Sequence, residues 1–171
     1  MKKKMETTFK TEVIKDLKNK KVTIKREFDA PVDLVWRTWT ESKLLDQWWA
    51  PKPWVAKTKY LKFEEGGSWL YAMTGPDGTA MWNIVEFKSI RKNSRFQATS
   101  FFCDENGNKT AGFPSMHWEN VFVGVDDHTN LEVEISFTEE KDLQQIIQMG
   151  FEAGFTAALG NLDELLASKI S

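Results

Sequence analysis

Cysteine and histidine are scarce in this chain of 171 residues, which contains only Cys103, His117 and His128. One cysteine excludes an internal disulfide and is typical of a protein kept in a reducing compartment, so we expect a cytoplasmic location. A structural zinc site needs three or four histidine, cysteine or carboxylate ligands, and these residues stand at no recognised metal spacing. We therefore expect neither a metal site nor a cofactor.

Long apolar runs and catalytic motifs are absent as well. The apolar stretches are only a few residues long, which excludes a transmembrane helix and stable membrane insertion. The first residues, MKKKMETTFK, contain lysines but no apolar core of a secretory signal. The chain has no GxSxG, no GxGxxG after a strand and no phosphate loop. Enzymatic activity is therefore less favoured than binding.

Charge is unevenly distributed along the chain. Residues 1–25 carry nine lysines against three acidic residues, so the rest of the chain has a net charge of −8 although the whole carries −2. We interpret residues 1–11 as a basic, disordered lead-in and residues 12–168 as one domain. Because nucleic acid requires a basic face, the acidic body argues against a nucleic-acid partner.

Hydrophobic periodicity predicts the first half of the fold. Residues 21–28 alternate between apolar and polar side chains, which indicates a strand. Two short helices follow, the first with Val32, Val35, Trp36 and Trp39 on one face and the second with Leu44, Leu45 and Trp48. Alternating segments separated by short polar turns then predict an antiparallel meander. These segments are SWLYAMT, TAMWNIVEFKSI, RFQATSFFC, MHWENVFVGV and LEVEISF.

The C-terminal segment has helical periodicity from Glu139 to Ser168, and we predict one unbroken helix there. A break at Gly150 would contradict this prediction. Gly150 and Gly154 each cost about 1 kcal/mol relative to alanine inside a helix, so we expect them to leave room for a close strand or a guest molecule. The layout predicts an α+β fold with the helix on one face of the sheet.

Four stretches resemble one known family. They are REFDAPVDLVWRTWT, LLDQWWAPKPW, FEEGGSWLYAMTGPDG and MGFEAGFTAALGNLDELLAS. Together they resemble the AHSA-type proteins, which are homologues of the activator of the heat-shock-protein-90 ATPase within the SRPBCC (START-like, birch-pollen-allergen-like) superfamily. The resemblance covers residues 12–168. It implies a helix-grip fold, in which a curved antiparallel sheet wraps around a long C-terminal helix and two short helices follow the first strand. It also implies an apolar cavity between the sheet and the long helix.

The stretch LLDQWWAPKPW, residues 44–54, holds three tryptophans and two prolines. We expect it to seal one end of the cavity, and part of it to contact the ligand. Core packing is the competing interpretation for every aromatic residue in the set. The residues expected to line the cavity are Trp49, Trp54, Trp69, Tyr71, Met73, Trp82, Met149, Phe151 and Gly154.

His117 and Glu119 share strand parity with Val121 and Val123. If the valines face inward, His117 and Glu119 lie at the cavity edge, where they could orient a ligand or transfer a proton. If the parity is the opposite, both residues meet solvent. We expect no functional role for Cys103 or His128.

Three functions are compatible with these features. The favoured hypothesis is a binding domain for an apolar, lipid-like or aromatic small molecule. The second is a cyclase-like or hydratase-like enzyme that uses His117 and Glu119. The third is a chaperone-ATPase-stimulating or other protein-interaction domain, although the eukaryotic co-chaperones that resemble this domain carry a further N-terminal domain. The sequence leaves both a monomer and a homodimer open.

Overall fold

The computed structural model describes residues 10–168, which form one sheet and four helices. Within that range the eight strands have the order β1-β2-β8-β7-β6-β5-β4-β3, and every neighbouring pair is antiparallel. The strands are β1 (Glu12–Asp16), β2 (Lys21–Phe28), β3 (Val55–Leu61), β4 (Ser68–Thr74), β5 (Ala80–Arg91), β6 (Arg95–Cys103), β7 (Met116–Val125) and β8 (His128–Ser136). The helices are α1 (Val32–Thr40), α2 (Ser42–Trp48), α3 (Glu140–Gln148) and α4 (Phe151–Ala167).

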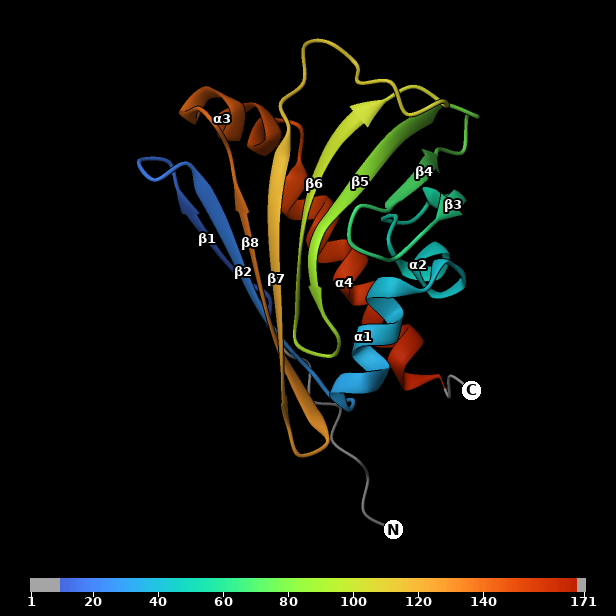
Figure 1. The fold of residues 1–171 in the computed structure, drawn as a ribbon, viewed down its shortest axis with the longest axis vertical. Coiled ribbons are helices and arrows are strands. Elements are labelled where there is room, and N and C mark those ends of the chain that lie inside the picture. Colours follow the sequence, from blue (N-terminus) through green and yellow to red (C-terminus); the bar gives the residue numbers. More distant parts are fainter. Residues whose placement is uncertain (1–9, 169–171) are drawn as a thin grey trace.

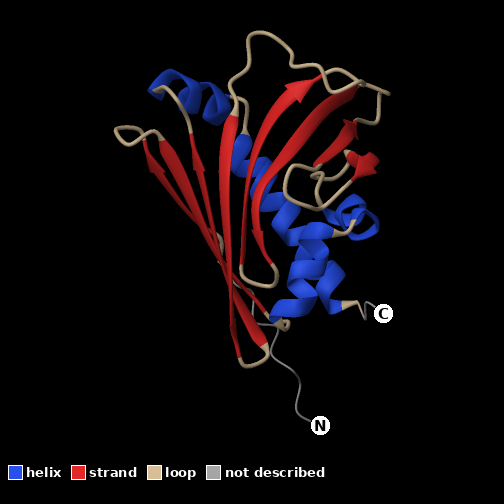
Figure 2. Ribbon diagram, in the orientation of Figure 1, coloured by secondary structure: helices blue, strands red, loops and turns tan. Residues whose placement is uncertain are grey.

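The sheet curves around α4, which crosses its concave face (Figure 1). Helices α1 and α2 lie at one end of this arrangement, and α3 lies at the other (Figure 2). The α+β helix-grip fold expected from the sequence is confirmed. The predicted domain start at residue 12 stays a prediction, and most of the predicted lead-in, residues 1–9, lies outside the described residues.

Alternation of apolar and polar side chains explains why the central strands form. In β2, Val22, Ile24, Arg26 and Phe28 are buried, whereas the residues that alternate with them are half-buried or exposed. The opposite strand, β8, contributes Val133 and Ile135 to the same core in register with Ile24 and Val22. This pairing of two inward-facing rows forms the core that α4 covers.

Helices α1 and α2 confirm the predicted short helices. The buried face of α1 includes Val35, Trp36 and Trp39, and that of α2 consists of Leu44, Leu45 and Trp48. Trp48 is fully buried, and its indole Nε1 donates a hydrogen bond of 2.7 Å to the backbone carbonyl of Thr38 in α1. This bond joins the two helices. For Trp48, one of the three tryptophans in residues 44–54, the core-packing interpretation is therefore the correct one.

The prediction of one unbroken C-terminal helix is wrong. Helix α3 ends at Gln148 and α4 begins at Phe151, and the two point in different directions (Figure 1). Gly150 has a φ angle of +87°, in the left-handed region that favours glycine. Its N–H donates to the carbonyl of Ile147 in α3, and its carbonyl accepts from Gly154 in α4. Periodicity continues across the break because both helices bury apolar residues against the same core.

Candidate ligand-binding cavity

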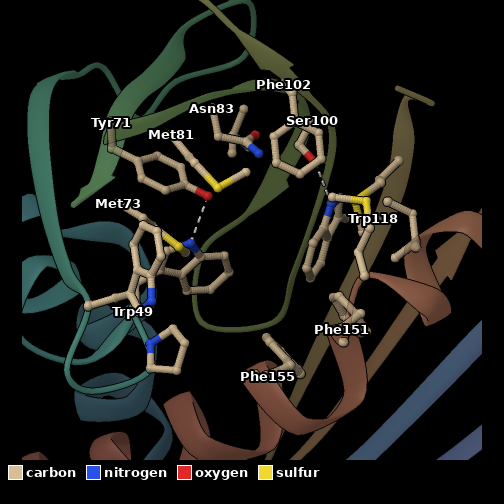
Figure 3. Close-up of a pocket in the computed structure, with 18 residues that line it drawn as sticks. Trp49, Tyr71, Met73, Met81, Asn83, Ser100, Phe102, Trp118, Phe151 and Phe155 are labelled. Carbon is tan, nitrogen blue, oxygen red and sulfur yellow. Dashed lines mark hydrogen bonds between the residues drawn. The ribbon is translucent and has the colours of Figure 1, made fainter. Parts of the chain in front are cut away.

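A cavity of about 420 Å³ lies between the concave face of the sheet and the C-terminal helices. Residues from seven parts of the fold line it (Figure 3). The lining residues are Trp49, Pro51 and Trp54 after α2; Tyr71 and Met73 of β4; Met81, Asn83 and Val85 of β5; Ser100 and Phe102 of β6; Met116 and Trp118 of β7; Ile146 of α3; and Met149, Gly150, Phe151, Gly154 and Phe155 at the helix break and on α4.

None of these described lining residues carries a charge, and most are aromatic or aliphatic. Four of them are methionines: Met73, Met81, Met116 and Met149. Methionine side chains are flexible and polarisable, so a wall rich in methionine adapts to ligands of different shape. Met81 and Met149 are also 39% and 44% exposed to solvent, so the cavity opens beside these two residues, which we call its mouth.

Trp49 lies at the centre of the aromatic wall. Its ring packs within 6.4 Å, centroid to centroid, of Trp69, Tyr71 and other aromatic rings. Its indole Nε1 donates a hydrogen bond of 2.8 Å to the hydroxyl of Tyr71. Tyr71 is itself stacked on Trp69 at 4.1 Å. Burial raises the pKa of the Tyr71 phenol well above its usual range, so this hydroxyl keeps its proton.

The opposite wall has the same chemistry. The indole Nε1 of Trp118 on β7 donates a hydrogen bond of 2.8 Å to the hydroxyl of Ser100 on β6. Phe151 and Phe155 of α4 are stacked on each other at 5.4 Å, and both contact the Trp118 ring. Figure 3 shows these rings facing Trp49 and Tyr71 across the cavity. The cavity is therefore bounded by aromatic rings on both sides.

Asn83 on β5 is the third polar residue of the lining. Its side-chain Oδ1 is buried and has no hydrogen-bond partner among residues 10–168. A buried amide without a partner is costly, and such groups in proteins are usually satisfied by water or a ligand. Asn83 Oδ1 is therefore an unsatisfied hydrogen-bond acceptor at the wall.

The structure places seven of the eleven residues predicted for the site on the cavity wall. These are Trp49, Trp54, Tyr71, Met73, Met149, Phe151 and Gly154. Trp69 faces the same side of the sheet and is stacked on Tyr71, but it is 3% exposed and lines a second cavity of about 30 Å³ instead. Gly154 leaves space: a Cβ atom built there would meet only Pro51 Cγ, at 3.9 Å.

The prediction for Trp82 is wrong. It was expected inside the cavity, but it lies on the convex face of the sheet beside Leu70, Ile84 and Cys103. In β5, Met81, Asn83 and Val85 face the cavity, so their neighbour Trp82 must face away. The prediction placed Trp82 in the cavity because it is aromatic and ignored its position in the strand alternation. The apolar cluster on the convex face was not predicted.

The prediction that His117 and Glu119 lie at the cavity edge is also wrong. Both lie on the convex face of β7, outside the cavity, because Trp118, Asn120 and Phe122 occupy the concave face. His117 Nδ1 is 3.2 Å from the Thr99 hydroxyl, and Glu119 pairs with Arg95 at 3.1 Å. The two valines chosen to set the parity face outward as well, and Val123 is 50% exposed. The residues with the largest apolar area, Trp118 and Phe122, would have given the correct parity.

Most of the lining residues that the prediction missed could have been identified from the alternation of side chains along each strand. Met81, Asn83 and Val85 of β5, Ser100 and Phe102 of β6, and Met116 and Trp118 of β7 all follow the alternation rule once one inward residue per strand is known. Phe155 lies one helical turn after Phe151 and was identifiable by the same periodicity. Pro51 and Ile146 lie in a loop and on α3, where the sequence gives no direction, and Gly150 was expected only to leave room for a close strand or a guest molecule.

Cys103 and His128 lie away from the cavity. Cys103 is buried on the convex face, where burial and the neighbouring Asp104 raise the pKa of its thiol to about 11. His128 begins β8 at the surface, with ring nitrogens 3.6 Å and 3.7 Å from carboxylate oxygens of Glu27 and Asp29. Neither residue contributes to the site. Among residues 10–168, no helix is both long and apolar enough to cross a membrane.

The fold and its cavity define a helix-grip domain. A family model described as Activator of Hsp90 ATPase homolog 1-like protein matches residues 29–167, so the chain belongs to this family. The relatives with solved structures include a protein from Arthrobacter aurescens, with 29% identity and a TM-score of 0.87 over 94% of this chain and 93% of that one.

Two further relatives are similar over nearly their whole length. A protein from Mycobacterium smegmatis has 27% identity and a TM-score of 0.86 over 96% of this chain and 100% of that one. A protein from Staphylococcus epidermidis has 27% identity and a TM-score of 0.80, covering 93% of this chain and 95% of that one. A comparison with curated proteins gave no match.

Proposed function

We propose that this protein binds an apolar or aromatic small molecule in the cavity between its curved sheet and its C-terminal helices. The observation that carries the proposal is the cavity itself, which is about 420 Å³ in volume, uncharged, rich in aromatic residues and open at Met81 and Met149. Small-molecule sites are typically concave and mostly apolar, with volumes of roughly 300–1,000 Å³ and a few polar groups.

The other hypotheses have less support. The enzyme hypothesis depended on His117 and Glu119, and both lie on the convex face, so we do not propose this pair as catalytic. The chaperone-related role rests on the family description alone and stays a prediction. A cytoplasmic location and the choice between monomer and homodimer also stay predictions.

Binding can be tested with Nile red, a neutral dye whose fluorescence rises in apolar surroundings. We expect the native protein to bind it and Gly154→Leu to abolish detectable binding, because the new side chain enters the cavity beside Pro51. Gly160→Leu is the matched control, since Gly160 lies on the exposed side of α4 with nothing within 4 Å of an added Cβ. Both variants gain about 1 kcal/mol of helix propensity, so both should remain folded.

Two results would contradict the proposal. One is native protein that does not bind Nile red. The other is a Gly154→Leu variant that keeps dye binding, or that loses about 1–3 kcal/mol of stability as an overpacked core does. If the native protein binds Nile red and Gly154→Leu does not, native mass spectrometry of freshly purified protein can be used to search for a co-purified natural ligand.

A further inference from the structure

The three polar residues of the cavity wall lie on adjacent strands. Tyr71 of β4 is directly opposite Asn83 of β5, and Ser100 of β6 is diagonal to Asn83, because it lies opposite Val85, two residues further along β5. All three line the cavity, and Figure 3 draws Asn83 between Tyr71 and Ser100 on the sheet side. They therefore form one polar edge along a wall that is otherwise apolar.

The two hydroxyl groups on this edge are held in the same way. Each accepts a hydrogen bond of 2.8 Å from a tryptophan indole, Tyr71 from Trp49 and Ser100 from Trp118. An indole N–H can only donate, so each hydroxyl is fixed as an acceptor toward its tryptophan and its own hydrogen must point elsewhere. No residue within 10–168 accepts a hydrogen bond from either hydroxyl. The tryptophans thus orient two hydroxyl donors.

The rest of the wall limits the charge of a ligand. Tyr71 and Ser100 are 4% and 3% exposed, so a group that meets them loses its water. None of the described lining residues is positively charged, and a carboxylate buried without a counter-charge is strongly disfavoured. Two hydroxyl donors and the amide nitrogen of Asn83 are sufficient to hydrogen-bond neutral carbonyl or ether oxygens, whereas Asn83 Oδ1 can only accept a hydrogen bond.

We propose that the Tyr71 and Ser100 hydroxyls, with the side-chain nitrogen of Asn83 between them, form a recognition edge for the acceptor oxygens of a neutral, largely aromatic or alicyclic ligand, such as an aryl ketone or a lactone. This inference rests on the proposed function and adds the chemical class of the ligand. The tryptophans position the hydroxyl donors, the aromatic rings contribute most of the affinity, and the polar edge selects oxygen-bearing molecules over hydrocarbons of the same shape.

The test uses three probes of similar size: benzophenone, which is a ketone; diphenylmethane, in which CH₂ replaces the carbonyl; and diphenylacetate, which is an anion. Protein is titrated into dilute probe by calorimetry. Because the probes differ in water solubility, the effect of each substitution is judged for one probe at a time, and only the neutral and anionic probes are compared directly, on native protein. We expect native protein to bind benzophenone and diphenylmethane, and to bind diphenylacetate at least about tenfold more weakly than benzophenone.

The decisive variant is the double change Tyr71→Phe/Ser100→Ala. It should weaken benzophenone binding about three- to tenfold, which is the effect of one neutral hydrogen bond, and leave diphenylmethane binding unchanged. Tyr60→Phe is the matched control, because Tyr60 on the edge strand β3 is 44% exposed and outside the cavity. It should change neither affinity.

The outcomes separate the two proposals. If native protein binds none of the probes, the proposed function fails, and this inference fails with it. If benzophenone and diphenylmethane both bind but the double variant treats them alike, the cavity binds apolar molecules and the recognition edge is wrong. Diphenylacetate that binds as tightly as benzophenone would overturn the neutral class.

A spectroscopic measurement keeps the inference testable if the double variant does not fold. The carbonyl stretching band of benzophenone bound to native protein should lie below its position in an alkane, because a hydrogen bond weakens the C=O bond. A band at the alkane position would show that no donor reaches the ketone and would overturn the proposal.

Discussion

At the residue scale, the tryptophans of this chain have three different roles. Trp48 is fully buried and joins α1 to α2 through its bond to the Thr38 carbonyl. Trp49, the next residue, turns its ring to the cavity wall and orients Tyr71. Trp82 packs on the convex face instead. The same side chain has a different role in each case because the local backbone points it in a different direction. The number of aromatic residues could therefore suggest a cavity but could not show which tryptophans line it.

Cys103 provides a prediction about reactivity. Its thiol is buried, and its pKa is raised to about 11, first by burial and then by Asp104. The thiolate is the reactive form, so at pH 8 native protein should react with a disulfide reagent about a hundredfold more slowly than unfolded protein, from the thiolate fraction alone. The rate should rise as the pH approaches 11.

The reaction is measured by absorbance with and without urea. A native rate within about tenfold of the unfolded rate would contradict this environment for Cys103.

The parity of β7 shows which residue-scale evidence is reliable. Val121 and Val123 suggested that His117 and Glu119 face inward, yet Trp118 and Phe122 occupy the concave face. Burying an aromatic side chain stabilises a fold more than burying valine, so the larger residues decide which face is covered. Sequence alone cannot show this choice, because both faces of β7 carry apolar residues.

At the element scale, Gly150 is the residue that separates α3 from α4. Its φ angle of +87° is unfavourable for any residue with a Cβ atom, although an added Cβ would meet nothing within 4 Å. Strain rather than crowding therefore decides the outcome of substitution. The break turns the Met149 side chain to the mouth of the cavity and allows α4 to follow the concave face.

This leads to a prediction with opposite signs for two glycines. Gly150→Ala should lower the free energy of unfolding by about 1–2 kcal/mol, because alanine is disfavoured in the left-handed region. Gly160→Ala should raise it by about 1 kcal/mol, because Gly160 lies inside α4, where alanine is the better helix former. Urea unfolding followed by circular dichroism measures both. Stabilisation by Gly150→Ala would mean that the C-terminal segment is one continuous helix.

Elements with clear periodicity were predicted well. Strand β2 was expected at 21–28, β4 at 68–74, β6 at 95–103 and β7 at 116–125, and the structure has these bounds. Strand β1 was missed because its five residues are mostly exposed and lack a buried row. Strand β3, at the other edge of the sheet, was missed for a similar reason, since only Ala56 in it is buried. Edge strands have little contact with the core, so their sequences carry a weak signal.

At the scale of the whole molecule, the cavity exists because side chains fill only part of the space between α4 and the sheet. Large side chains fill the space between α4 and the sheet near Leu159 and Leu162, both fully buried. Toward the helix break, Gly154 and Gly150 reduce the side-chain volume and the cavity begins. The sequence could predict the helix-grip fold and the space left by Gly154 on α4, but it did not predict the helix break at Gly150. It could not predict the cavity volume, which depends on the packing of residues from seven separate segments.

The contrast between the filled core and the cavity near the helix break predicts which part of the molecule a ligand stabilises. Helix α3 buries only Leu143 and Ile146, and Ile146 also lines the cavity. Gln145 of α3 donates a hydrogen bond of 2.9 Å to the carbonyl of Gly112, in the segment between β6 and β7. Elements with few buried residues open most readily, so α3 and its partner segment should exchange amide hydrogens faster than α4 in the free protein.

Bound Nile red should therefore slow amide exchange in residues 140–150 and near Gly112. A ligand at one hundred times its Kd can slow exchange up to about a hundredfold where opening releases the ligand. The hairpin at residues 125–128 is the internal control, because it lies outside the cavity and should keep its rate. Hydrogen–deuterium exchange read by mass spectrometry resolves these segments. Equal slowing of the hairpin would indicate global stabilisation only, whereas no change in 140–150 would show that α3 does not enclose the ligand.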